Sequence, residues 1–121
     1  MTGGSNRPLV TATVVGTLLQ LAMVVSGHYA PAIANLFAAG GMSISGIAGL
    51  VYSVLARPAG LGAAAGGGAA AGGISAFLGI LVSYFLGDVD PSVLGFGTAG
   101  SAATGLVGSV LGKLIAPRRT A

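Results

Sequence analysis

The chain has no cysteine, no tryptophan and no glutamate, and it contains a single histidine and two aspartates. The absence of cysteine excludes disulfide frameworks, thiolate metal sites and cysteine nucleophiles. One imidazole and two carboxylates provide little material for general acid–base catalysis or for a metal centre. We therefore expect no enzymatic activity, no cofactor and no bound metal.

Charge is also scarce, because only 6% of the 121 residues are Asp, Glu, Lys or Arg. A soluble globular domain has about 25% of such residues. Hydrophobic residues make up 54% of the chain, and the mean hydropathy is +0.94. Glycine is abundant, at 23 residues, but it lacks the three-residue period of collagen. These values exclude a water-soluble monomer and predict an integral membrane protein.

Long apolar runs account for most of the sequence. They cover residues 8–26, 32–56, 60–86 and 92–116, and short loops rich in glycine, proline or charge separate them. Each run has roughly the 20 residues that a helix needs to cross a bilayer. The sequence therefore predicts an all-α polytopic membrane protein with four transmembrane helices.

The two halves of the chain resemble each other. The segment Gly27–Pro31 matches Gly87–Pro91 at a shift of 60 residues, and Pro58 matches Pro117 at a shift of 59. We interpret this as two tandem parallel hairpin repeats, related by an axis along the membrane normal. The predicted organisation is an N-terminal tail (1–7), a first transmembrane hairpin (8–58), a second transmembrane hairpin (59–117) and a basic tail (118–121).

The distribution of charge predicts the orientation. Every basic residue lies on the side of the two termini and of the loop after the second run: Arg7, Arg57, Lys113, Arg118 and Arg119. The opposite side has only His28, Asp88 and Asp90. The positive-inside rule then places both termini in the cytoplasm, in the cell (inner) membrane. Lys113 lies near the end of its run, where its side chain can extend to the lipid headgroups. The basic character thus indicates contact with the lipid bilayer and no nucleic-acid binding.

Small residues recur at a spacing of four, which places them on one face of a helix. The rows predicted to pack helices together are Gly41, Ser45, Gly49 and Ser53 in the second run, and Gly100, Thr104, Gly108 and Gly112 in the fourth. The fourth run has a second row at Gly97, Ser101, Gly105 and Ser109. The third run has one row at Gly62, Gly66 and Ala70 and another at Gly68, Gly72 and Ala76. Such GxxxG-like faces let helices approach closely in lipid. They can pack within the chain, between copies or onto other proteins. Because one neighbour satisfies one face, two small faces on the fourth helix predict a homo-oligomer.

A polar stripe follows the first run, at Thr13, Thr17 and Gln20. These side chains either line a pore or form hydrogen bonds between helices. No Asp, Glu or Arg lies at mid-membrane depth. This absence argues against a proton relay, a voltage sensor and an ion-coupled carrier, which need an intramembrane ionisable group.

The loop before the fourth run has two acidic residues. Asp90 directly precedes Pro91, an arrangement typical of a helix start that the carboxylate caps. A second interpretation is a weak cation or proton site formed by Asp88 and Asp90 with His28 from the matching loop. Two carboxylates and one imidazole are few ligands for a metal.

The layout of the whole chain resembles that of phage holins, with a short sequence, Gly- and Ala-rich spans, small loops and a basic end at Lys113, Arg118 and Arg119. The stretch 72–114 also resembles small Gly-rich, stress-associated bacterial membrane proteins of three spans. The first resemblance implies self-association that permeabilises the inner membrane.

Two functions follow from these features. The first is a self-associating membrane protein that forms a permeation path, as a holin-like lesion or a small-solute channel. The second is a non-catalytic structural or accessory subunit of a larger membrane complex. The polar stripe of the first helix discriminates between them, because it faces a wet lumen in a pore and another helix in a scaffold.

Overall fold

The computed structural model describes residues 6–115, which form helices and turns without any strand. The elements are α1 (Arg7–Tyr29), α2 (Pro31–Ala34), α3 (Phe37–Leu55), α4 (Leu61–Phe85) and α5 (Ser92–Ile115). Within this part of the chain, α1, α3, α4 and α5 are long and apolar enough to cross a membrane. The prediction of an all-helical protein with four membrane-spanning helices is confirmed. Arg118 and Arg119 of the predicted basic tail lie outside the described residues, as does most of the N-terminal tail.

The first helix is longer than its apolar run. The N–H of Ala30 still donates to the carbonyl of Ser26, so the helical pattern continues past the predicted break at Gly27. Pro31 then restricts the residue before it, and Ala30 takes an extended conformation. Proline at the first helical position begins α2, as the sequence predicts.

The second run is interrupted, which the hydropathy pattern does not predict. At Leu36 the backbone N–H donates to the carbonyl three residues earlier, at Ile33. This tighter turn separates α2 from α3, so the membrane-spanning part begins at Phe37. Its 19 residues still extend roughly 28 Å at the rise of an α-helix, which is enough to cross the hydrocarbon core.

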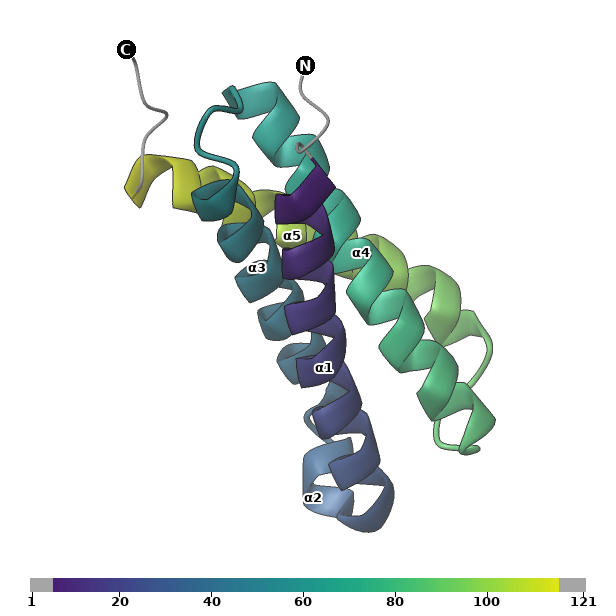
Figure 1. Cartoon of the computed structure of the whole chain (residues 1–121). Coiled ribbons are helices and arrows are strands. Elements are labelled where there is room, and N and C mark those ends of the chain that lie inside the picture. Colours follow the sequence, from purple (N-terminus) through teal and green to yellow (C-terminus); the bar gives the residue numbers. More distant parts are fainter. Residues whose placement is uncertain (1–5, 116–121) are drawn as a thin grey trace.

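The long helices alternate in direction, so α1 begins and α5 ends at the same end of the bundle (Figure 1). Helices α3 and α4 each pack against the other three long helices, and α1 and α5 lie on either side of this central pair. At the end that contains α2, the α1–α3 pair and the α4–α5 pair diverge (Figure 1). The bundle is therefore closely packed at one end and forked at the other.

The core consists of very small side chains. Its largest fully buried side chains are serines, among them Ser45, Ser75 and Ser109. A Cβ atom added to Gly49 would meet the carbonyl of Gly105, so the backbones of α3 and α5 lie against each other. Many large apolar side chains point outward instead, as expected for a surface that faces lipid.

The tandem repeat stays a prediction. Both pairs form helical hairpins, but α2 interrupts only the first. Helix α3 packs against α4, whereas the equivalent pair of the repeat, α1 and α5, does not pack in a comparable way. The two hairpins thus occupy different environments.

Candidate functional site

Helix α5 uses its two rows of small residues against two helices of the same chain. On the first row, added Cβ atoms at Gly108 and Gly112 would meet Gly46 and Ser53 of α3. On the second row, one at Gly105 would meet Gly68 of α4. Both faces therefore have partners within one chain, and they do not require a second copy.

The predicted packing residues of α3 lie in the same interfaces. Gly41, Ser45, Gly49 and Ser53 are all buried. The row at Gly62 and Gly66 differs, because added Cβ atoms there would meet nothing within 4 Å. Within residues 6–115, this row at the start of α4 is a small face that the chain leaves open.

Gln20 lies inside the bundle, with its side chain 2% exposed. Its Nε2 donates to the carbonyl of Gly41, at 3.0 Å, and to Oγ of Ser45, at 3.2 Å. The Ser45 hydroxyl donates in turn to the carbonyl of Gly72, at 3.1 Å. One chain of hydrogen bonds therefore joins α1, α3 and α4 at mid-membrane depth.

The other members of the polar stripe are placed differently. Thr13 and Thr17 are half-buried, and their hydroxyl oxygens are buried without a hydrogen-bond partner among the described residues. Thr17 lies about one turn and Thr13 about two turns from Gln20, toward the closely packed end of α1. Neither residue lines the cavity described next.

A cavity of about 570 Å³ lies between the two hairpins, where they diverge. Its outer end is lined by Asn35 and by Asp88 and Val89 of the α4–α5 turn, and its inner end by Gln20 and Ser101. Ligand-binding cavities in proteins commonly have volumes of roughly 300–1,000 Å³. The cavity therefore reaches from the loop region to the middle of the membrane-spanning segments and has the size of a ligand site.

The walls of the cavity are mainly apolar, with a few polar groups. Met23, Ile80, Val93 and Phe96 provide much of the apolar surface. Ser83 also lines it, and this side chain is 1% exposed, with a hydroxyl that has no hydrogen-bond partner within residues 6–115. Sequence reasoning missed Ser83, because a lone serine in an apolar helix is ordinary packing until the structure places it beside a cavity.

The outer ends of the two hairpins are joined by His28 and Asp88. The ring N–H at Nδ1 of His28 donates to Oδ2 of Asp88, at 2.8 Å. Asp88 is held by the end of α4, where Gly87 has a φ of +81° and the N–H of Asp88 donates to the carbonyl of Ser83. This left-handed glycine and the backbone bond form a Schellman-type cap, which directs the carboxylate toward α1.

His28 is thus brought to Asp88 but not to Asp90. The carboxylate of Asp90 accepts a hydrogen bond from the hydroxyl of Ser92, at 3.0 Å, and its backbone carbonyl accepts one from Val93. Pro91 directly precedes the first residue of α5. Among residues 6–115, no three His, Cys, Asp or Glu side chains come close enough to hold a metal ion.

Lys113 closes the opposite end of the bundle. Its side chain is 8% exposed, and Nζ donates to the carbonyls of Ala56 and Arg57, at 2.9 and 3.0 Å. The prediction that this side chain extends to the lipid headgroups is therefore wrong. The ammonium group instead bonds to carbonyls just after the end of α3, where a cation complements the helix dipole, and the carbonyl of Ala56 also accepts from the N–H of Ala59.

No family model, no curated protein and no solved structure matches the chain. The resemblance to holins therefore rests on the layout of the sequence alone. The physical basis for a function is the cavity and its polar groups.

Proposed function

We propose that the protein is a small-solute permeation protein of the cell membrane, and that the cavity between its hairpins is part of the path. The observation that carries this proposal is the cavity itself, which extends from the Asp88 turn to Gln20. A structural bundle has no need for a cavity of about 570 Å³ beside its central hydrogen bonds.

Passage across the membrane requires the closely packed end to open as well. That end is held by glycine and serine contacts such as Gly46–Gly108 and Gly49–Gly105. Faces without large interlocking side chains can slide or tilt with little repacking, as in shear motions of packed helices. The inner end of the cavity has no charged side chain, which suits an uncharged solute, since a charged one would lose its hydration there without gaining a partner.

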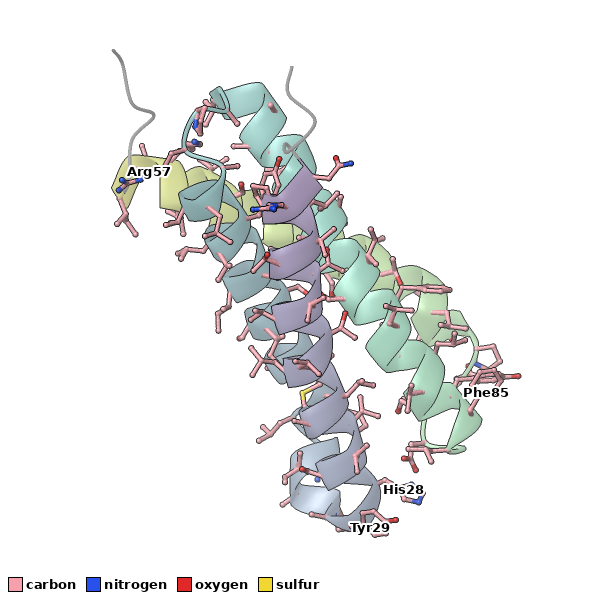
Figure 2. The ribbon with its side chains drawn as sticks, in the orientation of Figure 1. His28, Tyr29, Arg57 and Phe85 are labelled. Carbon is pink, nitrogen blue, oxygen red and sulfur yellow. The ribbon has the colours of Figure 1, made fainter. Side chains whose placement is uncertain are left out.

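The proposed orientation places both termini in the cytoplasm of an inner-membrane protein. Arg57 lies at one end of the bundle, and His28 and Tyr29 lie at the other (Figure 2). The basic end is then cytoplasmic by the positive-inside rule, and the cavity faces outward. Reporter fusions after Arg57 and after Asp88 test this orientation, and an external reporter after Arg57 would contradict it.

Self-association remains part of the proposal, through a different surface from the one that the fourth run indicated. The rows of α5 are occupied, whereas Gly62 and Gly66 face open space on α4. A second copy packing on this row would bring two backbones close together, as small faces do in lipid. A holin-like lesion would need such contacts between many copies.

The second candidate function is a structural or accessory subunit of a larger membrane complex. It is favoured by the amide of Gln20, which bonds to Gly41 and Ser45 of α3 as a polar stripe in a scaffold would. On this account the cavity takes up lipid chains or part of a partner helix.

Solute flux into proteoliposomes separates these functions. Purified protein is reconstituted, the vesicles are shrunk osmotically with glycerol or 1,2-propanediol, and re-swelling is followed by light scattering. Re-swelling faster than in protein-free vesicles, without release of trapped carboxyfluorescein, supports a small-solute path. Release of the dye supports a lesion. Re-swelling rates equal to those of protein-free vesicles would contradict permeation and support the accessory function.

A further inference from the structure

The side-chain hydrogen bonds of Gln20 within residues 6–115 both use its amide nitrogen. The groups around the amide of Gln20 determine which of its two terminal atoms is the nitrogen and which is the oxygen. The Gly41 carbonyl can only accept, and the Ser45 hydroxyl has already given its proton to the carbonyl of Gly72. Both bonds therefore need the two protons of Nε2, which leaves Oε1 as the free atom.

Oε1 lies between glycines of two helices, α3 and α4. Added Cβ atoms at Gly41 of α3 and Gly79 of α4 would lie 3.5 and 3.6 Å from this oxygen. Gln20 and Gly41 both line the cavity. A hydrogen-bond acceptor is thus held at the inner end of the cavity by bonds that lock its orientation.

Ser83 adds a second unpartnered group on the same wall. It follows Gly79 by four residues, so it lies one helical turn, about 6 Å, nearer the outer end. Buried polar groups are nearly always paired, and exceptions of this kind need an explanation. Thr13 and Thr17 have unpartnered hydroxyls away from the cavity, whereas Ser83 and Gln20 both line it, so these two residues are the ones that a ligand in the cavity could complete.

We infer that the inner end of the cavity binds an uncharged amphipathic molecule whose hydroxyl or N–H group donates to Oε1 of Gln20. Rotation of the Ser83 side chain about χ1 would turn its buried, unpartnered hydroxyl toward a second polar group of the molecule, for which it can donate or accept. The apolar body packs on Met23, Ile80 and Phe96. Asp88, at the outer end, is the only acidic or basic residue of the lining, so the inner end offers no partner for a charge.

This inference deepens the proposed function, on which it rests for the role of the bound molecule as the permeant. Lipid acyl chains are the competing occupant, since the walls are apolar. An acyl chain has no donor, so it fills the cavity without satisfying Gln20. Discrimination between a donor and a matched molecule without one therefore distinguishes the two occupants.

The test uses 4-butylphenol and its methyl ether, 4-butylanisole, which differ in the phenolic donor. Binding to the full chain in nanodiscs is measured by equilibrium dialysis against empty nanodiscs of the same lipid, which corrects for partition into the bilayer. We expect saturable binding of the phenol about tenfold tighter than that of the ether, the preference that one hydrogen bond provides. Equal binding of the two probes would overturn the inference.

Two sets of variants locate the site. Gln20→Met should abolish the preference for the phenol, and Leu19→Met, on the exposed face of the same helix, should retain it. Where Gln20→Met does not fold, Ser83→Ala should weaken phenol binding, and Val93→Trp, which fills the cavity, should abolish saturable binding of both probes. A preference that survives Ser83→Ala and Val93→Trp unchanged would also overturn the inference.

The outcome is separable from that of the proposed function. Donor-dependent binding without solute flux would uphold the site and contradict permeation. Solute flux without donor-dependent binding would uphold permeation and contradict the site.

Discussion

His28 and Asp88 form a hydrogen bond across 60 positions of sequence, with 2.8 Å between Nδ1 and Oδ2. The histidine lies at the end of α1, and the aspartate lies in the turn between α4 and α5. These are the ends at which the two hairpins diverge (Figure 1), and Asp88 also lines the cavity. The pair therefore joins the two hairpins across the outer end of the cavity.

Removal of this hydrogen bond should widen the fork. We expect Asp88→Ala to lengthen and broaden the distance distribution between spin labels at Tyr29→Cys and Phe85→Cys, which can be placed selectively because the chain has no cysteine. Double electron–electron resonance measures the distribution. Asp90→Ala is the matched control, since Asp90 bonds to Ser92 and not to His28. Identical distributions for Asp88→Ala and the unaltered chain would show that the pair does not restrain the hairpins.

Glycines in the helix interfaces should tolerate substitution less well than glycines that face open space. Gly49→Ala places a Cβ atom against the carbonyl of Gly105, so it should destabilise the bundle by about 1–3 kcal/mol through overpacking. Gly66→Ala meets no neighbour, so it should be neutral or stabilising by up to about 1 kcal/mol through helix propensity. Reversible unfolding in mixed SDS and dodecylmaltoside micelles gives both values. Comparable losses at the two positions would contradict the packing.

Lys113 should contribute to stability and not to lipid binding. Lys113→Met removes the hydrogen bonds to the carbonyls of Ala56 and Arg57, and a loss of about 1–3 kcal/mol is expected for buried bonds from a charged donor. Leu114→Met, at an exposed neighbouring position, should change stability little. The same micelle unfolding assay compares them. If the two variants unfold alike, the carbonyl contacts are unimportant.

Much of the fold can be predicted from the sequence, because long apolar runs have few structures available in a bilayer. The four membrane-spanning helices follow from residues 8–26, 32–56, 60–86 and 92–116. The break at Leu36 does not follow, since Asn35 is a single polar residue within the apolar run and no glycine or proline lies at the break. Local hydrogen bonding decides it, through the bond from Leu36 to Ile33.

The candidate site is only partly readable from the sequence. Gln20 is identifiable as a polar side chain at mid-membrane depth, but the choice between a lumen and a helix partner depends on Ser45 and Gly41, which lie more than 20 positions away. A row of small residues shows that a helix face can pack closely, but it does not show which helix packs against that face. From the sequence alone, the two small faces of α5 therefore predict packing against a second copy. In the structure, α3 and α4 of the same chain occupy these faces.

Self-association, where it occurs, should depend on the open row of α4. Gly66→Leu should reduce the dimer fraction at least severalfold without destabilising the monomer, because the added side chain separates two copies but meets nothing within one. Single-molecule photobleaching of labelled protein at low density in bilayers counts the subunits. Leu61→Ala, at an exposed neighbouring position, is the control. If the unaltered chain is monomeric at all protein densities in the bilayer, the protein does not self-associate.

The central claim is that the cavity between the hairpins is a path for small uncharged solutes, and its most direct test is the flux of glycerol and 1,2-propanediol through a cavity-filled variant. Val93→Trp places a large ring in the cavity, whereas Leu106→Trp places the same ring on the exposed face of the same helix. We predict that the unaltered chain and Leu106→Trp accelerate vesicle re-swelling equally, and that Val93→Trp lowers the rate to that of protein-free vesicles. Equal rates for both tryptophan variants, or no acceleration by the unaltered chain, would contradict the claim.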